Sequence, residues 1–389
     1  MIYKSLKILT SLFICASFIV SCGSGTSPGQ FISPSHVVVD STNDRVFVTE
    51  SPQQLVALVA STLEDIGDQP IVNEANDATT FALLPRVVSN FALFQTGAIS
   101  RLFIMGAFVD ANGNRVLNRI RVLDFDGTTF TQPSFSPIDL SDGDNSTLDT
   151  DNSYADMLVD QANSRLYITD ATTGLLYVLN PADGTTLNAP IAIAGTPQQM
   201  SLDNGRLYIC NSTSTVANQL VTVVNSSDFT TTTIDVGAPC RLIAAKSNTN
   251  GTVLLVKRSD SQTILILSVN TTTFASATPI NTATAGFLNG SLSAGTGITS
   301  SIGGISLSRS TSGIVYGYLS ELDGNIQYLT FGTNIDTYTI ETLSTSATDI
   351  TNSDVLTDTS GNASMAFIVG ETGTLINIDV GTTSVTVNN

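Results

Sequence analysis

The chain has 389 residues, of which 42% are apolar and 12% are charged, whereas an average globular protein has about 25% charged residues. Thirty-three acids and 15 bases give a net charge of −18, which repels phosphate backbones and argues against a nucleic-acid partner. The apolar fraction excludes a disordered chain, and the abundance of Val, Ile and Thr favours β-structure.

The N-terminus has the features of an export signal. Lys4 and Lys7 precede an apolar run over residues 8–20, which is shorter than the roughly 20 residues that span a bilayer. We therefore expect residues 1–21 to be a cleaved signal peptide. Its removal leaves 13 bases against 33 acids, a net charge of −20, so the mature protein is strongly acidic.

Residues 19–22, Ile-Val-Ser-Cys, resemble the lipobox of bacterial lipoproteins. The resemblance implies that Cys22 becomes the N-terminus and carries fatty acyl chains such as palmitate, which anchor the protein in a membrane. Gly23 follows where inner-membrane lipoproteins have Asp, which implies delivery to the outer membrane. The alternative is an ordinary signal peptide with an incidental cysteine. Residues 22–35 are rich in Gly, Ser and Pro and predict a flexible tether.

A repeated pattern begins after the tether. An alternating strand ends in Asp, a polar turn follows, and a second strand begins with Arg. The clearest copies are residues 36–50, 156–170 and 199–211, with the pairs Asp40 and Arg45, Asp160 and Arg165, and Asp203 and Arg206. A third strand follows each copy, and a Thr-rich fourth strand follows Asp228. Four consecutive antiparallel strands of this length form one blade of a β-propeller.

Weaker copies begin near Pro85, Cys240, Gly303 and Ser353, which brings the number of repeats to seven. The segments RLYITD and RLYICN resemble the YVTN-type β-propeller repeat. This resemblance implies an all-β fold in which residues 36–389 form a single propeller of seven four-stranded blades. We expect the domain to be monomeric. Immunoglobulin-like sandwiches and a β-solenoid are the competing folds, but sandwiches need linkers, and none follows Ser35.

A candidate ligand ring emerges when the inner strands are aligned on their aspartates. The aligned residues are His36, Asp156, Gln199, Arg241, Gly304 and Asp354. They would surround one mouth of the central channel, as a site for a small polar or ionic ligand or as a water-lined wall. The connections 67–84, 141–153 and 286–301 each precede an inner strand and should lie on the same face, which is the candidate binding surface.

Catalytic motifs are few. His36 is the only histidine, and no Walker A or C-x-x-C motif is present, so the sequence favours a noncatalytic role. A calcium site could use the hard oxygen donors Asp142, Asp144, Asp149 and Asp151, although the spacing is not that of an EF-hand and a solvated acidic loop is the alternative. No other cofactor is expected.

Two cysteines remain for pairing in the mature chain. Cys15 leaves with the signal peptide and Cys22 is acylated, which leaves Cys210 and Cys240. An oxidising compartment favours a disulfide, but facing sheets lie about 10 Å apart and a disulfide needs Cα atoms within about 7 Å. A bridge requires that both cysteines lie near a blade edge, so the paired and unpaired states both stay open.

These features together predict a lipid-anchored scaffold of the bacterial envelope that binds a protein or glycan partner. The alternatives are a calcium-assisted, lactonase-like hydrolase at the channel mouth and a purely structural envelope component.

Overall fold

A computed structural model provides the structure of the chain. It describes residues 34–50, 54–62, 64–70, 87–109, 115–116, 119–140, 154–214, 219–259, 264–269, 287–292, 302–310, 312–332, 338–344, 350–357, 363–370, 374–379 and 385–388. The predicted signal peptide, Cys22 and nearly all of the tether lie outside these residues.

Seven antiparallel sheets follow one another along the chain, and we number them in chain order. Sheet 1 contains β1 (Pro34–Asp40), β2 (Arg45–Glu50), β3 (Gln54–Val59) and β4 (Asp65–Pro70). Sheet 2 contains β5 (Val87–Thr96), β6 (Ile99–Val109), β7 (Arg115–Val116), β8 (Arg119–Phe125), β9 (Phe130–Thr131) and β10 (Ile138–Asp139). Sheet 3 contains β11 (Tyr154–Asp160), β12 (Arg165–Asp170), β13 (Leu175–Leu179) and β14 (Thr186–Ala192).

The remaining sheets have the same consecutive order. Sheet 4 contains β15 (Gly195–Asp203), β16 (Arg206–Ser214), β17 (Gln219–Asn225) and β18 (Thr231–Asp235). Sheet 5 contains β19 (Cys240–Asn248), β20 (Gly251–Arg258), β21 (Ile264–Val269) and β22 (Phe287–Leu292). Sheet 6 contains β23 (Ile302–Arg309), β24 (Val315–Glu321), β25 (Asn325–Phe331) and β26 (Tyr338–Ser344). Sheet 7 contains β27 (Ile350–Thr357), β28 (Ala363–Gly370), β29 (Thr374–Asp379) and β30 (Val385–Asn388).

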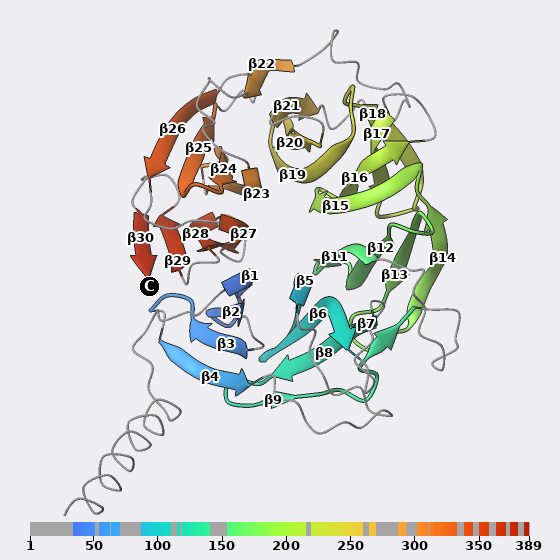
Figure 1. The fold of residues 1–389 in the computed structure, drawn as a ribbon, viewed down its shortest axis with the longest axis vertical. Coiled ribbons are helices and arrows are strands. Elements are labelled where there is room, and N and C mark those ends of the chain that lie inside the picture. Colours follow the sequence, from blue (N-terminus) through green and yellow to red (C-terminus); the bar gives the residue numbers. More distant parts are fainter. Residues whose placement is uncertain are drawn as a thin grey trace, which may run out of the picture.

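The sheets are arranged radially around one axis (Figure 1). The first strand of each sheet is the innermost, and these strands contact one another in the order β1, β5, β11, β15, β19, β23 and β27. The last of them, β27, packs against β1, which closes the ring. The prediction of one all-β propeller is therefore confirmed.

The predicted count of seven four-stranded blades is wrong, because the described residues form six four-stranded blades and one six-stranded sheet. The exception is sheet 2. Its strand β6 has 11 residues and extends past β8, since their pairing ends at Met105 and Ile120. The overhanging residues Phe108 and Val109 pair with the short strand β7, and β9 pairs with the other end of β8.

Apolar side chains fill the spaces between neighbouring sheets. Phe47 of β2 is fully buried and packs with Phe91 and Leu102 of sheet 2, whereas Val46 and Val48 on either side of it lie in a separate cluster. This alternation follows from the two-residue period of a strand, which sends successive side chains to opposite faces. Each sheet therefore has two apolar faces. Other clusters join sheets 2 and 3, 3 and 4, 4 and 5, 5 and 6, and 6 and 7.

The repeated aspartate organises the turn between the first two strands. The Asp40 carboxylate accepts hydrogen bonds from the amides of Thr42 and Asn43, both at 3.1 Å, and from the Asn43 side chain at 2.8 Å. It also accepts a bond from the Ser100 hydroxyl of sheet 2 at 2.5 Å. Asp160 holds its own turn through Asn163 in the same way. The repeat thus encodes an Asx-type turn that can also reach the next sheet.

The repeated arginine links its sheet to the next one. Arg45 is 9% exposed and donates to Ser100 Oγ at 2.8 Å, the Ala98 carbonyl at 3.0 Å and the Phe125 carbonyl at 3.2 Å. Its guanidinium lies over the Phe125 ring, 5.2 Å from the centroid. Arg165 of sheet 3 likewise donates to a carbonyl of sheet 4 and lies over an aromatic ring there.

We predict that Arg45→Ala lowers the free energy of unfolding by about 3 kcal/mol, because it leaves buried carbonyl groups without donors. Urea denaturation followed by circular dichroism measures the loss. The matched control is Arg241→Ala, since Arg241 is exposed and its truncation should change stability by less than about 0.5 kcal/mol. Equal losses in the two variants would show that Arg45 does not link the sheets.

Candidate functional site

All seven inner strands have an irregular register near the end at which they begin. The shifts lie between Pro34 and His36, Val88 and Asn90, Tyr154 and Asp156, Gly195 and Met200, Cys240 and Leu242, Ile302 and Gly304, and Ile350 and Asn352. Because the innermost strand of every sheet is its first strand, these shifts lie at one end of the ring, which we call the bulge end. Bulges redirect side chains and are common beside binding sites.

The predicted ring residues all lie near the bulge end, although not at one structural level. His36, Asp156 and Gly304 directly follow the shift in their strands, and Gln199 lies within the irregular part of β15. Arg241 is the inserted residue of β19, and Asp354 comes two residues after Asn352. In sheet 2 the equivalent position belongs to Asn90, which the sequence alignment did not identify. Only the pairing register of β5 and β6 identifies Asn90 as the equivalent residue.

Asp156 joins three sheets. Its carboxylate accepts hydrogen bonds from the Asn90 side chain of sheet 2, from the Met157 amide of its own sheet and from the Met200 amide of sheet 4. The residue is 5% exposed. Its two oxygens are therefore engaged in holding inner strands together.

Burial raises the pKa of Asp156 to about 7 from an ordinary value of 3.8, and the bonds from Met200 and Met157 oppose this rise. Between about pH 4 and 7 the folded protein holds a proton that the unfolded chain has lost. This group therefore stabilises the fold most at low pH, and its contribution falls as the pH rises to about 7.

We predict that Asp156→Asn removes a pH dependence of up to about 1.4 kcal/mol per pH unit in the free energy of unfolding between pH 4 and 7. Urea denaturation of both proteins across this range measures the difference. Asp126→Asn is the control, because Asp126 is fully exposed and bonds only within its own turn. Parallel profiles for Asp156→Asn and the parent protein would contradict the assignment.

Side chains of sheet 4 also bond to the inner strand of sheet 5. Gln199 Oε1 accepts from the Ile243 amide at 2.8 Å, and Ser201 Oγ accepts from the Ala245 amide at 2.9 Å. At the opposite end, Asp203 accepts from the Ser247 hydroxyl at 3.2 Å. The inner strands β15 and β19 are therefore connected along their length.

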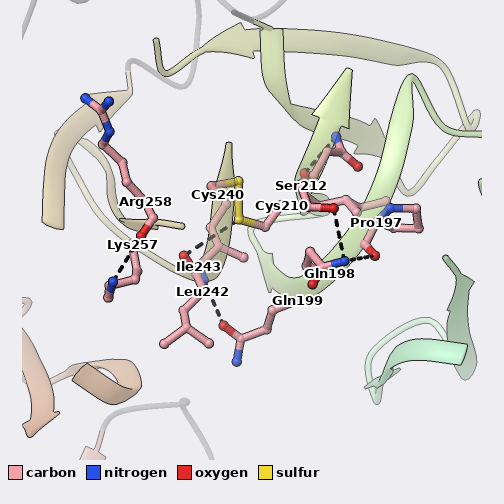
Figure 2. Close-up of a disulfide and its surroundings, with 12 residues drawn as sticks. Pro197, Gln198, Gln199, Cys210, Ser212, Cys240, Leu242, Ile243, Lys257 and Arg258 are labelled. Atoms are coloured by element: carbon pink, nitrogen blue, oxygen red, sulfur yellow. Dashed lines mark hydrogen bonds between the residues drawn. A yellow bond between two sulfur atoms is a disulfide. The ribbon is translucent and has the colours of Figure 1, made fainter. Parts of the chain in front are cut away.

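A disulfide joins the same two sheets at the bulge end (Figure 2). Cys210 of β16 and Cys240 of β19 are fully buried, with their Cα atoms 5.5 Å apart. Cys240 is the first residue of its strand, and Cys210 lies opposite the irregular part of β15. The bridge forms because both residues lie toward the same edge of adjacent sheets, where the strands approach closely.

We predict that the double variant Cys210→Ala/Cys240→Ala loses about 3 to 4 kcal/mol of stability, because it releases a loop of 30 residues in the unfolded chain. Urea denaturation of the variant and of the parent protein, with and without reductant, measures this loss. The reductant should shift only the parent protein. Two free thiols titrated in the unreduced, unfolded parent would contradict the bridge.

Other predicted site residues lie outside the described residues. They are the lipidation residue Cys22 and the calcium candidates Asp142, Asp144, Asp149 and Asp151. Of the three long connections, the described parts are strands, since residues 67–70 belong to β4 and residues 287–292 form β22. Within the described ranges, no three acidic, His or Cys side chains form a metal-binding group, and no helix is long and apolar enough to cross a membrane.

No family model and no curated protein matches the chain. Among solved structures, BBS1N, crystallised in complex with ARL6DN, is 10% identical with a TM-score of 0.58, and the match covers 93% of this chain and 97% of that one. A hydrazine synthase chain of Kuenenia stuttgartiensis is also 10% identical, with a TM-score of 0.56 and coverage of 92% and 98%.

A third similar structure is the dihydro-heme d1 dehydrogenase NirN in complex with DHE, which is 12% identical with a TM-score of 0.53. The match covers 92% of this chain and 66% of that one. At these identities the similarity shows the propeller fold alone. The three proteins have different roles, so the fold does not distinguish an enzyme from a binding domain.

Proposed function

We propose that the protein is an exported, lipid-anchored propeller of the bacterial envelope that works as a noncatalytic binding scaffold. The observation that carries the proposal is the bulge end, where seven inner strands begin with an irregular register around one axis. Polar residues lie near this end on packed strands, and ligand sites are often built from polar groups on such rigid elements. The partner would be a protein or a glycan.

The anchor and the export of the protein are supported by one feature each. The signal sequence ends in a lipobox-like segment before Cys22, and the folded part contains a buried disulfide between sheets 4 and 5. Structural disulfides persist in oxidising compartments, which fits an exported protein. The YVTN-like segments RLYITD and RLYICN begin strands β12 and β16 and fit the same type of surface propeller.

A hydrolase is the weaker candidate. A calcium-assisted reaction at the bulge end would use the Asp156 carboxylate, but both of its oxygens already accept N–H bonds from neighbouring strands. That geometry supports a structural role for Asp156, so we do not propose catalysis.

Site-specific photocrosslinking in intact cells tests the scaffold proposal. Ser259 and Thr249 are exposed at opposite ends of the β19–β20 hairpin, Ser259 at the bulge end and Thr249 in the turn. We predict that a crosslinker at position 259 gives one discrete adduct, whereas the same group at position 249 does not, because the partner contacts the bulge end. Adducts from position 249 alone, or none from position 259, would refute this binding face.

Cell fractionation of a Cys22→Ala variant tests the lipid anchor in the cells that are used for crosslinking. The parent protein should remain with the membranes, and the variant should lose acylation and appear in the soluble or uncleaved precursor fraction. An unmodified N-terminus on the mature parent protein, measured by mass spectrometry, would refute the anchor without affecting the crosslinking result.

A further inference from the structure

Most positive side chains of this acidic protein lie on two sheets, on strands β6 to β8 of sheet 2 and on the β19–β20 hairpin of sheet 5. Beyond residue 22 the chain has 13 bases, and four of them lie on β19 and β20. These four are Arg241, Lys246, Lys257 and Arg258, and they include both lysines of the mature chain. Three of these residues lie on the backbone at the bulge end, because Arg258 pairs with Cys240 and Lys257 pairs with Leu242 on either side of Arg241. The Lys257 and Arg258 side chains point in opposite directions (Figure 2).

Arg241 is placed to meet a ligand. It is exposed, and as the inserted residue of the bulge it has no partner in the strand ladder. The backbone on both sides of it is held, since Cys240 is in the disulfide and the Ile243 amide donates to Gln199. A fixed backbone lowers the ordering cost of binding. The planar guanidinium matches the oxygens of a carboxylate or phosphate.

Gln199 offers a second donor group on the neighbouring inner strand β15. Its Oε1 is used by the Ile243 amide, so its orientation is set and the amide nitrogen remains as the outward group (Figure 2). Ile243 follows Arg241 by two residues, about 7 Å along a strand. The Lys257 ammonium, which donates to the Arg258 carbonyl at 3.0 Å, adds a nearby buried positive charge.

From this arrangement we propose that the bulge end of sheet 5 binds an oxyanion group, a carboxylate or a phosphate, on the ligand of this protein, with Arg241 and Gln199 as the direct donors. The inference rests on the proposed binding function and specifies its ligand chemistry. The net negative charge of the chain does not prevent this, because physiological salt screens charges beyond about 8 Å and local cations dominate at contact.

Isothermal titration of the full mature lipoprotein in detergent, with sodium phosphate and sodium acetate as separate probes, tests the site. We expect Arg241→Gln to raise the dissociation constant of at least one probe ten-fold or more. Arg241→Lys should raise it at least three-fold, because it keeps the charge but loses the planar donor pair. Lys246→Gln is the matched control, since it removes the same charge from the other end of β19 and should change binding less than two-fold.

Two results would overturn the inference. One is that the parent protein binds neither probe, and the other is that Lys246→Gln weakens binding as much as Arg241→Gln, which would indicate diffuse charge attraction. Different results would refute the scaffold proposal and the oxyanion site. Crosslinking at position 259 without any anion binding refutes the oxyanion site and keeps the scaffold, whereas anion binding at Arg241 without any crosslink refutes the scaffold.

Discussion

The structure depends on burying both faces of every sheet around a closed ring. Phe47 and its neighbour Val48 show the requirement at one strand, because they are both fully buried yet face different clusters. A single sheet of this kind would expose both of its apolar faces, so no sheet is stable without its neighbours. Each sheet consists of consecutive strands, and the ring closes by packing β1 against β27 and β28. Side-chain contacts between sheets therefore determine the stability of the whole.

The polar residues of the repeat stabilise the same contacts between sheets. Asp40 holds its turn and reaches Ser100, while Arg45 donates to three groups of the next sheet. Gly127 leaves room for this arginine, because a Cβ atom there would lie 2.7 Å from Arg45 Nη2. The most visible repeat in the sequence thus encodes adhesion between sheets. It identifies the fold and says little about the ligand.

The sequence predicts the regular hairpins well and the inner-strand details poorly. Strands β2, β12 and β16 begin at Arg45, Arg165 and Arg206, where the repeat places them, because alternation and turn chemistry are local properties. Long-range pairing determines the rest. A bulge moves Arg241 one residue out of the expected alignment, and Asp156 meets Asn90 from 66 residues away. The disulfide likewise depends on how closely two sheet edges approach, which no spacing in the chain reveals.

The buried carboxyl of Asp156 lowers the stability of the fold near neutral pH. The groups that bond to its carboxylate are all N–H donors, so an uncharged side chain with an acceptor oxygen could make part of the same network without burying a carboxyl group. The raised pKa means that the carboxyl at this position destabilises the fold as the pH approaches 7. Ordinary packing rules do not favour such a choice, but this carboxyl joins sheets 2, 3 and 4 at one point. The bulges lie at the same end of the ring, where seven irregular strand starts forgo regular ladder bonds and Arg241 is exposed.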